Sequence, residues 1–193
     1  MKKNIAIIGF GTAGQRFFAC LKKKNNIKII KIIVKTKRNI FFKNKNISGT
    51  FTDIKDLSDI DGVIIATNYK ASFKYAKFFL KNKVPILIEK PFCETVSQSK
   101  KIENLFKKNK SSFLINYSDT FDPKFVQLVN KGLKKIGAIE SIIGTYGNNK
   151  TLYPVKNNYY PFQNWISHPI SMFLKICGKI TKFKIIKYKL EKK

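Results

Sequence analysis

Residues 5–14 read Ile-Ala-Ile-Ile-Gly-Phe-Gly-Thr-Ala-Gly, and the prediction of the fold rests on them. The apolar run before the first glycine is typical of a strand buried in a parallel sheet. Gly9, Gly11 and Gly14 form a GxGxxG pattern between this strand and a helix predicted over residues 13–24, a context that indicates a dinucleotide-binding turn. Gly9 permits the tight turn, Gly11 lets a pyrophosphate approach, and Gly14 lets helix and strand pack closely. Because a helix N-terminus binds phosphates, the predicted cofactor-binding residues here are Gly9, Gly11, Thr12, Ala13 and Gly14.

Strands and helices alternate through residues 1–117 of this 193-residue chain. Such alternation implies a parallel sheet with right-handed crossovers. We therefore expect a Rossmann-type, doubly wound α/β domain over residues 1–117, with a six-stranded, mainly parallel sheet and helices on both faces. After the first strand, the predicted strands cover residues 27–34, 63–66 (counted as the fourth), 85–89 and 112–117, and the predicted helices cover residues 72–81 and 95–108.

The pattern changes after residue 117, and residues 118–193 are predicted to form a small, truncated α+β domain for substrate binding or oligomerisation. Helices are expected over residues 123–133 and 166–176, the second ended by Gly178. Strands are expected over residues 138–146 and 181–190, paired with each other and laid against the helix near 166–176. Two strands alone are marginal in water. The isolated chain is therefore expected either to form a homo-oligomer through this sheet or to fray after Gly178.

The net charge of +28 comes almost wholly from lysines scattered through every segment, with Arg16 and Arg38 as the only arginines. Proteins that read bases rely on the forked arginine guanidinium, so a general bias in composition is favoured over a specific nucleic-acid surface. The three cysteines form neither a disulfide framework nor a metal-site spacing, which favours a reducing cytoplasm and predicts no bound metal. No apolar run approaches the roughly 20 residues of a membrane span.

The residues after the second predicted strand bear on the choice of cofactor. Sites that prefer NAD usually place a carboxylate there, for the ribose hydroxyls. This chain has no acidic residue before Asp53 and instead carries Thr36, Lys37 and Arg38, which favour a 2′-phosphate and hence NADP over NAD. A loop filled by the lysine bias is the alternative interpretation. Ala66 and Thr67 end the fourth predicted strand, at the rim where a cofactor binds.

Ile88-Glu89-Lys90-Pro91 ends the next parallel strand. With the Glu89-Lys90-Pro91 triplet downstream of GFGTAG, the chain resembles the glucose–fructose oxidoreductase / inositol dehydrogenase (Gfo/Idh/MocA) family. The resemblance runs from Lys3 to about Ile186, through VIIATNYKASFKYAKFFLKNKVPILIEKPF, NYSDTFDP, IGAIESIIGTYG and NWISHPISMFLKICG. It implies hydride transfer between a nicotinamide and a hydroxyl-bearing carbon, usually of a sugar or cyclitol. It also implies that the bond before Pro91 is cis.

The resemblance assigns roles to individual residues. Glu89 and Lys90 would lie at the cofactor, Lys90 would contact substrate and nicotinamide together, and His168, the only histidine, would be the acid/base. A packed loop histidine is the plainer interpretation of His168 on its own. Asn164 stands where an assisting aspartate is common in the family, and an amide cannot take up a proton. The expected substrate residues are Lys90, Asn164, Trp165 and His168.

Some patterns allow two interpretations. The aromatic residues before His168 could stack on a sugar or pack the loop. Asp119 and Asp122 could do acid/base work as a pair, although Asp122 before Pro123 is a natural helix N-cap. Asn68 and Ser72 replace residues that are often proline and histidine in the family. Because only 76 residues follow Tyr117 (193 − 117), a nucleotide-binding protein without catalysis and a truncated family member are the alternatives to a working enzyme.

Overall fold

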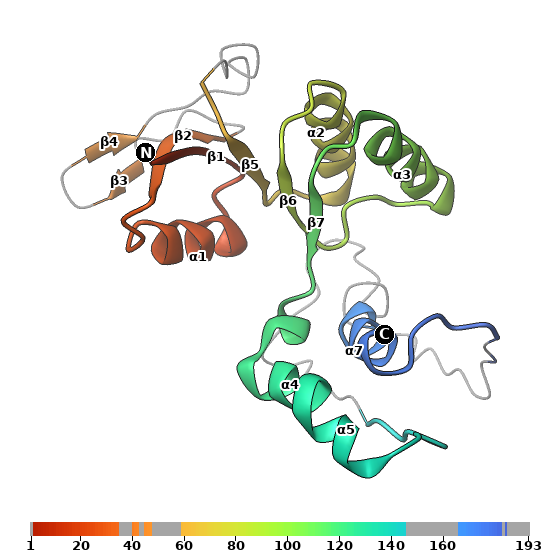
Figure 1. Ribbon diagram of the computed structural model, residues 1–193. Helices are drawn as coiled ribbons and strands as arrows, with labels where there is room; N and C mark the ends of the chain where they lie inside the picture. The colour runs from red at the N-terminus through yellow and green to blue at the C-terminus, as the bar shows by residue number, and fades with distance from the viewer. Residues whose placement is uncertain are drawn as a thin grey trace, which may run out of the picture. The chain divides into compact units, whose positions relative to one another are not determined.

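The first strand lies in the middle of a parallel sheet, as expected. In the computed structural model, β1 (Lys3–Ile8) pairs with β2 (Ile27–Ile33) on one side and with β5 (Gly62–Ile65) on the other. The sheet continues through β6 (Ile86–Glu89) and β7 (Phe113–Asn116), giving the order β2-β1-β5-β6-β7 (Figure 1). All four pairings are parallel, which confirms the predicted α/β class.

The structure describes part of the chain and divides it into two units. Contacts separate Met1–Asn116 from Tyr117–Lys193, and each unit is described by itself. The described residues are 2–34, 40–42, 45–47, 59–145, 166–182 and 184.

Helices cover both faces of the sheet because successive strand residues point to opposite sides. On one face, Ala6 and Ile8 of β1 pack with α2 (Tyr69–Lys81) and α3 (Val96–Asn109). On the other face, Ile7 packs against Phe18 of α1 (Thr12–Leu21). The larger core contains Ala6, Ile8, Ile33, Val63, Ile65, Tyr75, Ala76, Phe79, Leu80, Ile86, Ile88 and Ile102, and the smaller one contains Ile7, Phe18, Ile32 and Ile64.

The predicted third strand, between residues 34 and 63, is not found in the sheet among the described residues. Between β2 and β5, the short strands β3 (Ile40–Phe42) and β4 (Lys45–Ile47) pair with each other in an antiparallel hairpin of their own. The described residues give five strands in the sheet, and much of the stretch where the third strand was expected lies outside them. A run of three residues can satisfy its backbone groups with an adjacent run, and it then needs no place in the larger sheet.

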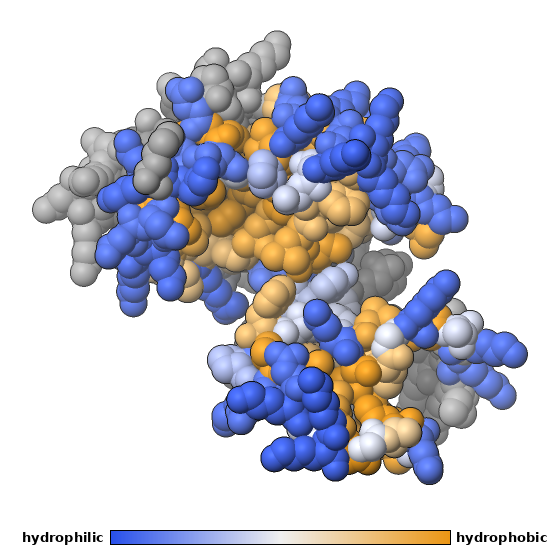
Figure 2. Space-filling view, viewed as in Figure 1, coloured by the Kyte–Doolittle hydropathy of each residue, from blue (hydrophilic) through white to orange (hydrophobic). Residues whose placement is uncertain are grey.

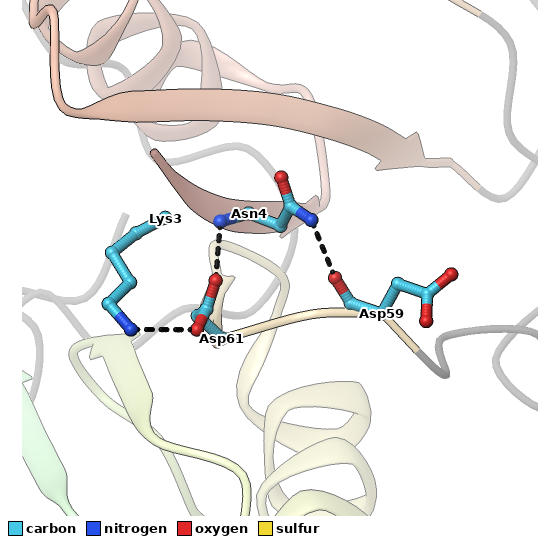
Figure 3. A network of polar contacts seen from close by, with 4 residues as sticks. All are labelled: Lys3, Asn4, Asp59 and Asp61. Carbon is cyan, nitrogen blue, oxygen red and sulfur yellow. Dashed lines mark hydrogen bonds and ion pairs between the residues drawn. The ribbon is translucent and has the colours of Figure 1, made fainter. Parts of the chain in front are cut away.

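A polar network fixes the start of β1 to the turn before β5 (Figure 3). The Asp61 carboxylate accepts from the Lys3 ammonium at 2.9 Å and from the Asn4 backbone N–H at 2.8 Å, while the Asn4 amide donates to the Asp59 carbonyl at 3.0 Å. The Asn4 N–H, followed by the Lys3 ammonium, lowers the pKa of Asp61 from its ordinary value of 3.8. These bonds extend the contact between β1 and β5 beyond the Ile5–Gly62 pair, where their ladder begins.

The second unit is helical where it is described. η2 (Ser118–Phe121) leads into α4 (Pro123–Gln127), a π-helical segment η3 (Leu128–Gly132) and α5 (Leu133–Ile136), with α7 (Ser167–Cys177) later in the chain. The Asp122 carboxylate accepts from the N–H groups of Lys124 and Phe125 at 2.9 and 3.2 Å, which confirms the predicted cap. Gly178 ends α7 with φ of +78°, as expected of a glycine at that position.

The strand expected over residues 138–146 is not formed over 138–145, and the prediction was wrong for that stretch. A strand is stable only when neighbouring strands or helices cover it, and Ile143 remains 95% exposed here. The strand expected over 181–190 falls mostly outside the described residues, and its described positions 181, 182 and 184 have no regular structure. The expected pairing of these two strands therefore has no counterpart in the described part of the second unit.

The two units differ in how they bury apolar side chains. Among the described residues of the second unit, Phe125 is the one buried large apolar side chain. Figure 2 shows apolar side chains at the surface of this unit, between hydrophilic ones. Its exposed large apolar residues are Phe121, Val126, Leu128, Ile136, Ile139, Ile142, Ile143, Ile170, Leu174 and Ile180. Across both units, none of the described helices is long and apolar enough to cross a membrane.

Candidate nucleotide-binding and acid/base sites

Two glycines of the turn after β1, Gly9 and Gly14, leave no room for a side chain. Gly9 has φ of +90°, and a Cβ there would overlap the Ala66 carbonyl oxygen and lie 2.9 Å from Cγ2 of Thr67. A Cβ on Gly14 would overlap the carbonyl oxygen of Gly9. The first and third glycines therefore hold the turn against the end of β5 and against the first turn of α1.

Gly11 differs from these two glycines because it faces open space. A Cβ added there would meet nothing within 4 Å, and the residue is exposed. Gly11 is the N-cap of α1, whose first turn contains Thr12, Ala13 and Gly14 and no acidic residue. The first N–H groups of a helix lack acceptors within it and carry the positive end of its dipole. An open face in front of such N–H groups fits the pyrophosphate of a dinucleotide.

The end of β5 lies beside this turn. The Ala66 N–H donates to the Ile8 carbonyl at 2.7 Å, so the strand ends of β1 and β5 remain adjacent. The Thr67 and Ser72 hydroxyls lie 2.9 Å apart, and the Ser72 hydroxyl also reaches the Thr67 carbonyl at 3.1 Å. Asn68 caps α2 by accepting from the Ala71 N–H at 3.1 Å. β1 has β2 on one side and β5 on the other, so the strand order reverses direction at β1. Ligands of open α/β sheets bind at the carboxyl ends of the strands where the order reverses.

Glu89 ends β6 and Lys90 follows it, at the same edge of the sheet. The Glu89 carboxylate accepts from the Asn116 amide of β7 at 2.7 Å and from the Lys90 N–H at 3.2 Å. The Lys90–Pro91 peptide bond is cis, as the family resemblance implies. Lys90 is partly buried. The triplet is therefore tied to the neighbouring strand through Glu89.

In the second unit, His168 is the second residue of α7 and its side chain is 9% exposed. Its Nδ1 lies 3.1 Å from Oδ2 of Asp119 in η2. The Ser118 hydroxyl donates to the other carboxylate oxygen of Asp119 at 3.2 Å, and the Ser171 hydroxyl donates to the His168 carbonyl at 2.7 Å. An imidazole held beside a carboxylate can exchange a proton while the carboxylate stabilises its charged form.

The predicted site residues fall into three groups. Gly9, Gly11, Thr12, Ala13, Gly14, Ala66, Thr67, Glu89 and Lys90 all follow carboxyl ends of strands in the first unit. Thr36, Lys37, Arg38, Asn164 and Trp165 lie outside the described residues. Lys90 and His168 belong to different units, so their meeting at one cleft stays a prediction.

The contact between Asp119 and His168 was not predicted from the sequence. Asp119 was considered only with Asp122, whose capping role explains one carboxylate of the two. The sequence held one hint: Asp122 explains the cap of α4, so Asp119 was left without a role in its own segment. The partner, 49 residues further along the chain (168 − 119), could not be identified from any local pattern.

Comparison with known proteins agrees with the geometry of the first unit. Residues 3–117 match a family described as an oxidoreductase family with an NAD-binding Rossmann fold. A search of curated proteins finds no match to the chain.

Solved structures share the fold. A Bacillus subtilis protein named as an oxidoreductase, yvaA, has a TM-score of 0.72 at 17% identity over 92% of this chain and 53% of its own. An oxidoreductase from Bacillus cereus gives 0.71 at 22% identity over 92% and 53%. GenD2 from gentamicin A biosynthesis, solved in complex with NAD, gives 0.58 at 15% over 67% and 39%. The chain thus spans about half the length of the first two structures.

Proposed function

Because this chain belongs to the Gfo/Idh/MocA oxidoreductase family, with its NAD-binding Rossmann fold, we propose that it transfers a hydride between a nicotinamide cofactor and the hydroxyl or carbonyl carbon of a sugar-like substrate. The observation that carries the proposal is the glycine turn. Gly9 and Gly14 close it against β5 and α1, while Gly11 leaves open space before the helix N-terminus. Gly11, Thr12, Ala13 and Gly14 would hold the pyrophosphate, and Ala66 and Thr67 would line the adjacent strand end.

The chemistry needs a group that handles the hydroxyl proton. The bound nicotinamide would accept or donate the hydride. Hydride leaves a carbinol carbon readily only as the hydroxyl proton is removed, and His168 would take that proton in oxidation and return it in reduction. The Lys90 ammonium would stabilise alkoxide character on the substrate oxygen. Support comes from the partial burial of Lys90 at the end of β6 and from the carboxylate beside His168.

For the cofactor we propose NADP in preference to NAD. The support is the sequence after β2, where Thr36, Lys37 and Arg38 occupy the positions that would meet the adenosine ribose and no carboxylate precedes Asp53. NADPH should therefore bind more tightly than NADH in a fluorescence titration. Thr36→Asp should move the preference towards NADH by about 1–3 kcal/mol, because it adds a repulsive charge near the 2′-phosphate. Thr36→Ser keeps the hydroxyl and is the matched control. Equal affinities of the parent chain for both nucleotides would refute the preference.

The second candidate is a nucleotide-binding protein that lacks catalysis. The observation that favours it is Asn164, a neutral amide at the position where the resemblance implies an assisting aspartate. Steady-state turnover with NADP⁺ on a panel of aldoses, polyols and cyclitols separates the two candidates. Turnover that His168→Ala abolishes supports the enzyme, whereas tight NADPH binding with no turnover supports the binding protein.

We further propose the cytoplasm as the compartment. All three cysteines, Cys20, Cys93 and Cys177, are free thiols, and a reducing environment preserves that state. Burial raises the pKa of the Cys93 thiol, which disfavours the reactive thiolate form of this cysteine.

A further inference from the structure

A buried imidazole in the second unit faces a carboxylate with its inner nitrogen. Nδ1 of His168 is shielded from solvent and lies 3.1 Å from Oδ2 of Asp119. The Asp119 side chain is itself 36% exposed, so this carboxylate keeps some contact with water while one oxygen faces inward. The pair thus connects a buried ring nitrogen to a solvated charge.

Both partners are held by local hydrogen bonds. The Ser118 hydroxyl fixes Oδ1 of Asp119 at 3.2 Å, and the Thr120 N–H and hydroxyl both donate to the Tyr117 carbonyl, at 3.0 and 2.8 Å. On the other side, Ser171 donates to the His168 carbonyl and holds the first turn of α7. The carboxylate therefore sits on a closed turn that packs against α7.

The chemistry of the two groups assigns the proton between them. An ionised carboxylate only accepts hydrogen bonds, so the nitrogen facing it must carry a hydrogen. In the neutral ring of His168 that nitrogen is Nδ1, and the lone pair then belongs to Nε2. A proton taken from outside the ring is accepted at Nε2 alone.

We propose that Asp119 is the positioning residue of His168: it holds the imidazole as the Nδ1–H tautomer and makes Nε2 the nitrogen that exchanges the substrate proton. The assignment rests on the proposed function for its catalytic meaning. When Nε2 takes the hydroxyl proton, the ring becomes an imidazolium whose Nδ1–H still donates to Asp119, and the carboxylate stabilises the new charge without taking the proton. Asn164 cannot supply such a charge, because an amide is neutral.

The test uses the single histidine of the chain as its own probe. In full-length protein labelled with ¹⁵N-histidine, a long-range ¹H–¹⁵N correlation spectrum above the titration of the ring should show a protonated Nδ1 and an unprotonated Nε2. Asp119→Leu removes the acceptor and should move the ring towards the Nε2–H form. Asp122→Asn is the matched control, because asparagine caps a helix about as well as aspartate and this change should leave the tautomer as it is. An Nε2–H ring in the parent protein overturns the inference, whether or not any variant folds.

Kinetics with the panel substrate that is turned over supply the second readout. Asp119→Asn should lower kcat by on the order of 10²–10⁴-fold with little change in KM, since positioning acts on proton transfer and not on ground-state binding. In a His168→Ala background the same change should have no further effect, because the two residues act as a unit. An additive loss would overturn the positioning role. Undiminished turnover of His168→Ala would instead refute the proposed catalysis while the NMR assignment stands, so the two failures are distinguishable.

Discussion

Alanine substitutions at Gly9 and Gly11 should have opposite effects, although the two glycines are two residues apart. Gly9→Ala places a Cβ against the Ala66 carbonyl and the Thr67 methyl at a backbone φ of +90°. Gly11→Ala places the same atom in open space. The pair therefore separates the glycine that shapes the turn from the glycine that leaves room for a ligand.

The expected loss for Gly9→Ala is the sum of two terms. Forcing an L-residue into positive φ costs about 1–2 kcal/mol, and inserting a methylene-sized group into a packed site costs about 1–3 kcal/mol. The free energy of unfolding should fall by about 2–5 kcal/mol. For Gly11→Ala, the weaker N-cap costs about 0.5–1 kcal/mol, and the reduced freedom of the unfolded chain returns about 0.4–1 kcal/mol. The net change should be within about 0.5 kcal/mol.

Urea denaturation followed by circular dichroism measures both changes. With a slope of about 1–3 kcal/mol per M, Gly9→Ala should lower the midpoint by roughly 1–2 M, and Gly11→Ala should leave it in place. NADPH titration of Gly11→Ala should nevertheless show a loss of about tenfold or more, the equivalent of about 1.4 kcal/mol, because the new methyl group occupies the face expected to meet the pyrophosphate. Equal midpoints for the two variants would refute the packing argument. Unchanged NADPH affinity in Gly11→Ala would refute the placement of the phosphates.

Two further predictions concern polar contacts of the first unit. Because the folded pKa of Asp61 lies below its ordinary value of 3.8, its stabilising contribution is present above pH 3.8 and is lost as pH falls through the folded value. Asp61→Asn should therefore be less stable than the parent at neutral pH, with the difference vanishing in acid; a difference that stays constant with pH would contradict the role of Lys3 and Asn4. Asn68→Ala should remove the cap bond to the Ala71 N–H and cost about 0.5–2 kcal/mol in thermal or urea denaturation, while Asn68→Asp, which keeps a cap, should cost little.

Much of the first unit follows from local patterns in the sequence. The run from Ile5 to Ile8, the glycine turn and the β-branched segment near Ile64 each predict their own element, and the structure has them where expected. These patterns work because parallel strands buried on both faces must be apolar throughout. The hairpin of β3 and β4 was missed because each strand has three residues, too few to show the alternation of apolar and polar residues by which a strand is predicted.

In the second unit the prediction succeeded at helix ends and failed elsewhere. Asp122 and Gly178 carry their signals in their own chemistry, as a capping carboxylate and a residue without Cβ. The expected strand near Ile142 depended on partners that a periodicity argument cannot supply. The contact between Asp119 and His168 depends on how η2 and α7 pack, which no local signal encodes.

The central position of β1 has a consequence for synthesis of the protein. Residues 3–8 are translated before both of the strands that flank them, and β2 follows closely enough to pair with one edge. The other edge waits for Gly62, which is 54 residues after Ile8 (62 − 8), or roughly 3–11 s at translation rates of about 5–20 residues per second. The helices that cover Ala6 and Ile8 are translated later still. The growing chain therefore carries an open, apolar β1 edge for seconds, and unpaired apolar strand edges make incompletely folded chains prone to aggregation.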